Sequence, residues 1–341
     1  MPMTLADLKP FALTMGDPAG LGGEIAVKAW RRRAKLELPA FFMVDDPARV
    51  AKIAKQLNID APVVEVDGPA AAAACFDAAL PVLPVRLDKP VLPGKPTPES
   101  APFVLRSIEL AVKLALGGEA AGVVTNPIGK AVLAASGFKH AGHTQYLGEL
   151  CGPGHRPVML FACSTLRTVP LSVHCSLAEA VRRLSADLLK STAHTLFDAL
   201  RRDFGVEEPR IAVAGLNPHA GEDGLLGREE IDLIIPALAQ LRAEGLMLTG
   251  PFPGDSLFTE KVRVTYDAAL CMYHDQALIP VKTIDFAHGV NVTLGLPIVR
   301  TSPDHGTAYD IAGSGTAQAN SLIAALWLAS DIARRRQRFG A

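Results

Sequence analysis

The strongest constraint on the fold is an alternation of short apolar runs with longer amphipathic segments. The apolar runs are rich in β-branched residues and have the length of strands, at 11–16, 40–44, 62–66, 120–125, 167–174, 210–216 and 268–274. Segments of helical length and pattern lie between them, at 24–35, 101–116, 177–204 and 228–244. This alternation predicts an α/β fold in which helices cover both faces of a sheet.

The size of the chain predicts two lobes. At 341 residues it exceeds the length over which a single hydrophobic core usually keeps growing. No low-complexity linker separates independent modules, so we expect interleaved lobes with a central cleft. The approximate boundaries are 1–130 plus 290–341 for one lobe, and 131–289 for the other; the resemblance described below implies that the first lobe binds the cofactor and that the second binds metal and substrate and forms a dimer.

Composition excludes several classes of protein. A hydrophobic fraction of 49% and a mean hydropathy of +0.23 are incompatible with disorder. A net charge of −1 gives no electrostatic footprint for nucleic acid. No apolar stretch reaches membrane-spanning length and the first residues do not form a signal peptide, so we expect a cytoplasmic protein. The five scattered cysteines, without a CxxC pair, indicate neither disulfides nor a thiolate zinc site.

Three histidines share a sequence context. His174, His219 and His274 each come at or shortly after the end of an apolar run that is predicted to be a strand. Such residues can converge at one edge of a sheet, where neutral imidazoles with open positions form a catalytic site for a divalent metal. Their spacing carries no local motif, so isolated hydrogen-bonded histidines are the alternative.

A second group of side chains suits an anion. Lys282, Asn291 and Arg300 recur at nine-residue intervals, each beside an apolar segment. Arginine offers phosphate a planar fork, and lysine offers a point charge. His143 and Thr144 lie at a predicted junction between a loop and a helix, where backbone amides can also bind an anion. Structural ion pairs of Lys282 and Arg300 with nearby aspartates are the alternative.

The third group concerns a nucleotide cofactor. No GxGxxG sequence follows a predicted strand, which argues against a Rossmann site. The glycine-rich turn after the first strand carries Asp17 and Glu24, which either approach a cofactor or shape the turn. Near the other end of the chain, His305, small residues such as Gly306, and Asp310 could hold NAD. A carboxylate suits the 2′-hydroxyl of the NAD ribose and disfavours the extra phosphate of NADP.

These motifs carry a resemblance to a known superfamily. GDPAGLGGEI and HGTAYDIAGSGTAQAN resemble signatures of the isocitrate and isopropylmalate dehydrogenases, which bind NAD without a Rossmann fingerprint. Within that superfamily the chain resembles the 4-hydroxythreonine-4-phosphate dehydrogenase family of vitamin B6 biosynthesis. Six motifs match it in order over nearly the whole chain: MGDPAGLGGEI, VVTNPIGK, GHTQYL, GLNPHAGEDGLLGREE, MYHDQALIPVK and VNVTLGLPIVRTSPDHGTAYDIAG. Gly23 replaces the usual proline of the first motif.

The resemblance implies a fold and a set of residue roles. The implied fold is a two-lobed α/β/α structure of the isocitrate-dehydrogenase kind, forming a homodimer with each active site at the interface. The three histidines named above would bind Zn, Mg or Co, and the anion-binding group would hold a small phosphorylated amino-acid substrate. The proton acceptor is left open between Lys282, a metal-bound water and Asp255.

The implied reaction is oxidation of the C3 hydroxyl of 4-phosphooxy-L-threonine by NAD. The resulting 3-oxo acid then loses CO2 to give 3-amino-2-oxopropyl phosphate. Related enzymes that oxidise D-threonate or D-erythronate 4-phosphate, or a cis-dihydrodiol carboxylate, are the nearest alternatives. A metal-dependent phosphatase or aldolase and a phosphate-ligand sensor are hypotheses from other classes, and neither needs a nicotinamide cofactor.

Overall fold

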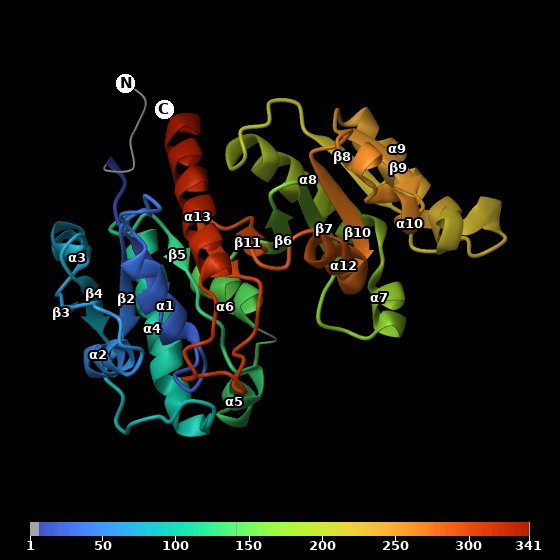
Figure 1. The fold of residues 1–341 in the computed structure, drawn as a ribbon. Coiled ribbons are helices and arrows are strands. Elements are labelled where there is room, and N and C mark those ends of the chain that lie inside the picture. Colours follow the sequence, from blue (N-terminus) through green and yellow to red (C-terminus); the bar gives the residue numbers. More distant parts are fainter. Residues whose placement is uncertain (1–6, 141, 341) are drawn as a thin grey trace. The chain divides into compact units, whose positions relative to one another are not determined.

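The computed structural model describes residues 7–140 and 142–340, which form two compact units. One unit contains the chain up to His155 and again from Leu296, and the other contains Arg156–Gly295. The chain therefore crosses from the first unit to the second and returns (Figure 1). Both boundaries differ from those expected at 130 and 290. Residues 131–155 belong to the first unit because their apolar side chains join its core.

The first unit has a parallel sheet with strand order β3-β4-β2-β1-β5-β12. Its strands are β1 (Phe11–Thr14), β2 (Phe41–Asp45), β3 (Val63–Glu65), β4 (Leu80–Pro84), β5 (Val123–Val124) and β12 (Arg300–Pro303). Its helices are α1 (Gly22–Arg31), α2 (Pro47–Gln56), α3 (Pro69–Cys75), α4 (Ala101–Leu116), α5 (Lys130–Ala135), α6 (His143–Leu150) and α13 (Asn320–Phe339), with a 3₁₀ turn at Pro98–Ser100.

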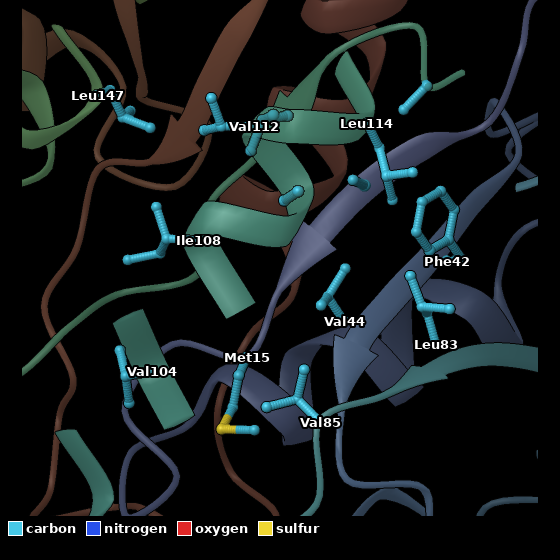
Figure 2. Close-up of a cluster of buried hydrophobic side chains, with 14 of the residues drawn as sticks. Met15, Phe42, Val44, Leu83, Val85, Val104, Ile108, Val112, Leu114 and Leu147 are labelled. Carbon is cyan, nitrogen blue, oxygen red and sulfur yellow. The ribbon is translucent and has the colours of Figure 1, made fainter. Parts of the chain in front are cut away.

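Helix α4 lies on one face of this sheet. Val104 and Ile108 of the helix belong to the same buried apolar cluster as Met15 of the loop after β1 and Phe42 of β2 (Figure 2). All four residues of β1 are buried, and successive side chains of a strand point to opposite faces. The sheet is therefore covered on both sides, as the near-continuous apolar character of parallel strands predicts.

The second unit has a mixed sheet with strand order β11-β6-β7-β10-β8-β9. Its strands are β6 (Val158–Cys163), β7 (Leu166–Ser172), β8 (Arg210–Ala214), β9 (Met247–Phe252), β10 (Ala268–Tyr273) and β11 (Val290–Leu294). Strands β7, β10, β8 and β9 are parallel, whereas β6 pairs antiparallel with both β7 and β11. Its helices are α7 (Leu177–Arg183), α8 (Ala186–Arg202), α9 (Ile235–Ala243), α10 (Gly254–Leu257), α11 (Glu260–Arg263) and α12 (His274–Ile284).

The predicted α/β fold is confirmed, and every predicted strand overlaps an observed one. The predicted helix 177–204 is wrong in one respect, because it divides into α7 and α8. Leu184 is extended, and the Ser185 side chain accepts a hydrogen bond from the Leu188 amide, which starts a new helix. The predicted helix 228–244 begins as a π turn at Glu230–Ile234 and continues as α9. Among the described residues, no helix combines the length and apolarity that crossing a membrane requires.

Candidate functional site

The three candidate metal histidines follow three neighbouring parallel strands of the second unit. His274 comes directly after β10, His174 two residues after β7, and His219 five residues after β8. In the register of the sheet, Tyr273 at the end of β10 pairs with Ser172 at the end of β7. All three histidines therefore follow the carboxyl ends of strands that are neighbours in the sheet order β7-β10-β8.

His174 and His274 are close together at this edge. Their ring centres are 6.1 Å apart, about 1 Å more than two imidazoles on one tetrahedral ion would require. Nδ1 of His274 lies 2.7 Å from Oδ1 of Asp275. A donor bond from Nδ1–H to this carboxylate leaves the lone pair on Nε2, which is the tautomer a metal ligand needs.

His219 lies in a left-handed turn. His219, Ala220, Glu222 and Asp223 have φ between 43° and 54°, and Gly221 between Ala220 and Glu222 has φ 85°. The left-handed conformation costs an L-residue about 1–2 kcal/mol, so four such residues must be held by their surroundings. His174 has φ 54° as well. Two of the three histidines thus sit on strained backbone, which is typical of functional sites.

The three histidines do not form a ready ligand set. Over residues 7–140 and 142–340, no three or more His, Cys, Asp or Glu side chains lie close enough together to hold a metal ion. His174 and His274 line one hollow of about 370 Å³. His219 lines a neighbouring pocket of about 670 Å³ together with Asp255 and Asp275. The residue types and the sheet edge fit a divalent metal, but a single chain brings only His174 and His274 near one another.

Gln276 connects two of the histidine-bearing segments. Its Oε1 accepts a hydrogen bond from the Met272 amide (2.7 Å), and its Nε2 donates to the Gly215 carbonyl (2.7 Å). The end of β10, before His274, is thereby joined to the segment that leads from β8 to His219. No sequence signal distinguishes this side chain, since its partners are backbone groups.

In the first unit, Arg300 is a buried guanidinium at the start of β12. It is 3% exposed, and its Nη2 donates to Oγ1 of Thr125 at 2.6 Å. Burial lowers the pKa of Arg300 to about 9, so the side chain remains charged at neutral pH. A buried guanidinium of this kind suits a phosphate or carboxylate.

His143 faces this positive charge as a neutral imidazole. It is the first residue of α6, as the predicted loop-to-helix junction requires, and Thr144 follows it. Burial lowers the pKa of His143 well below its ordinary value, and the charges of Arg300 and Lys130 lower it further. Its Nε2 is buried and has no hydrogen-bond partner among the described residues. His143 and Arg300 therefore share one cationic, partly closed environment.

Lys282 and Asn291 belong to the second unit. Lys282 is in the last turn of α12, with its ammonium 5.8 Å from the ring centre of Phe286. Asn291 lies on β11, opposite Phe161 of β6. Its Oδ1 is buried and lacks a hydrogen-bond partner within the described ranges. The five predicted anion-binding residues are thus divided between the two units.

The loop that carries the candidate NAD residues packs on the glycine-rich turn. Asp17 accepts hydrogen bonds from the Ala19 amide (2.9 Å) and from the Tyr309 hydroxyl (2.7 Å). Glu24 binds Lys28 (2.7 Å) and the Ala317 amide (3.1 Å). Both carboxylates therefore have structural partners, which supports the interpretation that they shape the turn.

The candidate NAD residues themselves remain accessible to different degrees. Asp310 and Gly306 are exposed and His305 is partly buried, with Nδ1 3.1 Å from the Gly306 carbonyl oxygen. Tyr309, which we did not predict, anchors this loop through Asp17. The burial of the Tyr309 hydroxyl, followed by its bond to Asp17, raises its pKa.

The fold and these sites define an α/β enzyme of two interleaved units that presents imidazoles in one unit and a buried cationic site in the other. A family model described as "Pyridoxal phosphate biosynthetic protein PdxA" matches residues 37–329. The chain belongs to this family.

Relatives support the assignment over the whole length. The 4-hydroxythreonine-4-phosphate dehydrogenase of Erythrobacter litoralis is 51% identical over 329 residues, which cover 96% of this chain and 98% of that protein. The crystal structure of 4-hydroxythreonine-4-phosphate dehydrogenase from Klebsiella pneumoniae is 36% identical with a TM-score of 0.85, covering 96% and 98% of the two chains. A terephthalate 1,2-cis-dihydrodiol dehydrogenase from Burkholderia xenovorans is 28% identical with a TM-score of 0.63, covering 95% and 98%.

Proposed function

We propose that this protein is a 4-hydroxythreonine-4-phosphate dehydrogenase of pyridoxine 5′-phosphate biosynthesis, acting as a cytoplasmic homodimer. The observation that carries the proposal is the full-length similarity to proteins of that name, 51% over 96% of the chain. In the proposed reaction NAD takes a hydride from C3 of 4-phosphooxy-L-threonine, whose hydroxyl loses its proton. The product, 2-amino-3-oxo-4-phosphooxybutanoate, then loses CO2 to give 3-amino-2-oxopropyl phosphate.

The substrate phosphate would bind to Arg300 and His143, which share one environment in the first unit. Arg300 supplies a buried charge, and His143 supplies a neutral imidazole whose Nε2 is buried beside it. Thr144, Lys282 and Asn291 would complete the contacts. A charged donor and a neutral ring together fit a phosphoryl group, which needs several directed hydrogen bonds.

The divalent metal, Zn, Mg or Co, would be held by His174, His219 and His274. The partner subunit would complete this site across the dimer interface. Support comes from the shared sheet edge and from the 6.1 Å separation of the His174 and His274 rings. When bound, such an ion lowers the pKa of a coordinated hydroxyl and stabilises negative charge on oxygen. Asp275 orients His274 for this role through Nδ1.

The cofactor NAD would bind along the loop containing His305, Gly306 and Asp310. Asp310 is exposed and can accept hydrogen bonds from a ribose hydroxyl. The nicotinamide performs the redox step, and the protein aligns it with the substrate.

Two side chains are candidates to accept the hydroxyl proton. Asp255 lines the pocket that also contains His219, which favours it by position. Lys282 lies in the last turn of α12 and has a cation–π contact with Phe286. A metal-bound water is the third possibility that the sequence left open.

A direct test is NADH formation, followed by absorbance, with 4-phosphooxy-L-threonine and D-threonate 4-phosphate compared side by side. Each assay is run with and without a chelator, and with Zn, Mg or Co added back. Chelator-sensitive turnover that prefers the amino substrate supports the proposal. Preference for the sugar-acid phosphate would reassign the substrate, and absence of NADH with both substrates would contradict the proposed function.

A further inference from the structure

Glu230 is a buried carboxylate that has no part in the chemistry proposed above. It is 1% exposed and begins the π turn that precedes α9. Its Oε1 accepts hydrogen bonds from the backbone amides of Leu216 (2.7 Å) and Asn217 (2.8 Å), and its Oε2 accepts one from Nδ2 of Asn217 (2.9 Å). All three donors belong to the segment that leads from β8 to His219.

The loop encloses this carboxylate closely. A Cβ atom at Gly221 would lie 2.8 Å from Oε2 of Glu230, and one at Gly215 would lie 3.1 Å from Oε1. Glycine at these two positions therefore lets the backbone pass on both sides of the carboxylate. Because Gly221 is in the middle of the left-handed turn, contact with Glu230 extends beyond the two amides to the turn itself.

Asn217 links the carboxylate to the functional pocket. Its Nδ2 donates one hydrogen to Glu230 and the other to Oε2 of Glu229 at 2.7 Å. Asn217 and His219 both line the pocket of about 670 Å³ that also contains Asp255. Asn217 therefore donates to two carboxylates and also lines the pocket.

We propose that Glu230 is a positioning residue, which fixes the strained turn so that His219 and Asn217 face the pocket. The left-handed turn needs an external restraint, and Glu230 provides one with three hydrogen bonds at a site closed to water. The consequence for catalysis rests on the proposed function, whereas the consequence for the loop does not.

The test uses substitutions that exchange a carboxylate for an amide of the same shape. Glu230→Gln keeps an oxygen for the two backbone amides but turns an NH2 group toward Nδ2 of Asn217, so two donors oppose each other. Glu229→Gln is the matched control, because this neighbouring carboxylate accepts from Nδ2 of Asn217 but from neither the Leu216 nor the Asn217 amide. The double variant Asn217→Asp with Glu230→Gln restores the side-chain pair with donor and acceptor exchanged at unchanged net charge.

Three quantities are measured for each folded variant: hydrogen exchange of the Leu216 and Asn217 amides, Zn²⁺ affinity by chelator competition, and kcat/KM with 4-phosphooxy-L-threonine and NAD. We expect Glu230→Gln to lose about tenfold or more in Zn²⁺ affinity and in kcat/KM, since a hydrogen bond to a charged group is lost. Exchange of the two amides should become faster. Glu229→Gln should remain near wild type. The double variant should lose less than Asn217→Asp alone, because both lack the bond from position 217 to Glu229 and only the double variant restores the pair between positions 217 and 230.

Equal losses in Glu230→Gln and Glu229→Gln, or wild-type exchange and kinetics in Glu230→Gln, would overturn the positioning role. If Glu230→Gln does not fold, the double variant is compared with Asn217→Asp alone. Higher activity and slower amide exchange in the double variant then support the role, and equal values refute it. Should the wild-type protein form no NADH, the proposed function fails, and the amide exchange still decides whether Glu230 fixes the loop.

Discussion

Replacing Thr125 by valine tests whether the buried guanidinium of Arg300 holds the substrate phosphate. Valine has the shape of threonine without the hydroxyl, so the change removes the acceptor that lies 2.6 Å from Nη2 of Arg300. Both side chains are buried, and water cannot easily replace the lost partner. A hydrogen bond to a charged group contributes about 1.5–3 kcal/mol.

The expected effect on substrate binding follows from this energy. If the hydroxyl orients Arg300 toward the phosphate, its loss should raise KM for 4-phosphooxy-L-threonine by roughly ten- to one-hundred-fold. The inhibition constant of inorganic phosphate should rise in parallel, while KM for NAD stays near wild type. Steady-state kinetics with each ligand varied in turn measure all three values.

Thr301→Val is the matched control. Thr301 is equally buried, lies on β12 next to Val124 of β5, and donates from Oγ1 to the Ala325 carbonyl at 2.9 Å. Its substitution should cost about 1 kcal/mol of stability without raising KM for the substrate. Thermal unfolding of both variants separates stability from binding. An unchanged substrate KM in Thr125→Val, or the same increase in both variants, would refute the assignment of Arg300 to the phosphate.

Three further predictions concern the other candidate residues. His219→Ala should lose divalent metal and turnover together, as measured by metal content and NADH formation; full activity of metal-depleted protein would contradict the metal role. Asp310→Ala should lower the preference for NAD over NADP by about fivefold or more in kcat/KM, because the carboxylate no longer disfavours the 2′-phosphate; an unchanged ratio would reject this residue. The pKa of His143 is held below its ordinary value of 6.5 by burial and then by the charges of Arg300 and Lys130. As pH falls, the unfolded chain therefore binds this proton at a higher pH than the folded protein does. The resulting stability is present above pH 6.5 and is lost as pH falls below it, by up to about 1.4 kcal/mol per pH unit. Chemical denaturation between pH 7 and 5 should show a steeper loss in wild type than in His143→Gln, and equal slopes would contradict the assignment.

The sequence predicts the strands and their polar ends well because both signals are local. An apolar β-branched run that stops at a polar residue, as before His274, marks the end of a buried strand without any knowledge of the fold. The position of the three histidines after neighbouring strands then follows from one further fact, that parallel neighbours end at the same edge of a sheet. What the sequence does not contain is the strand order β7-β10-β8, which makes those strands neighbours.

Side-chain partners far apart in sequence could not be predicted. Asp17 and Tyr309 are 292 residues apart, and Arg300 and Thr125 are 175 residues apart. Each residue alone suits several roles, and only the packing of β12 beside β5 brings Arg300 to Thr125. Glu230 was missed for a similar reason, since two of its three donors are backbone amides, which every residue except proline carries.

The segment before Lys282 shows that secondary structure, too, is not always evident from neighbouring residues. Lys282 follows an apolar run that contains Pro280, a residue that is unfavourable inside a helix. The structure has α12 across Pro280, because Ala277, Leu278 and Val281 are spaced to bury one helical face against the sheet core. Lys282 therefore extends from a helix and not from a strand end.

The two units differ in how firmly they hold their candidate ligand groups before any ligand binds. Arg300 is buried and bonded to Thr125, and Nε2 of His143 is buried beside it. His174 and His219 are exposed instead, on left-handed backbone. A preorganised anion site loses little conformational freedom on binding, whereas exposed imidazoles must be ordered by what they bind. The phosphate contacts proposed for Arg300 and His143 therefore need little rearrangement. The restraint of the His219 turn by Glu230 would reduce the ordering cost of the exposed histidine.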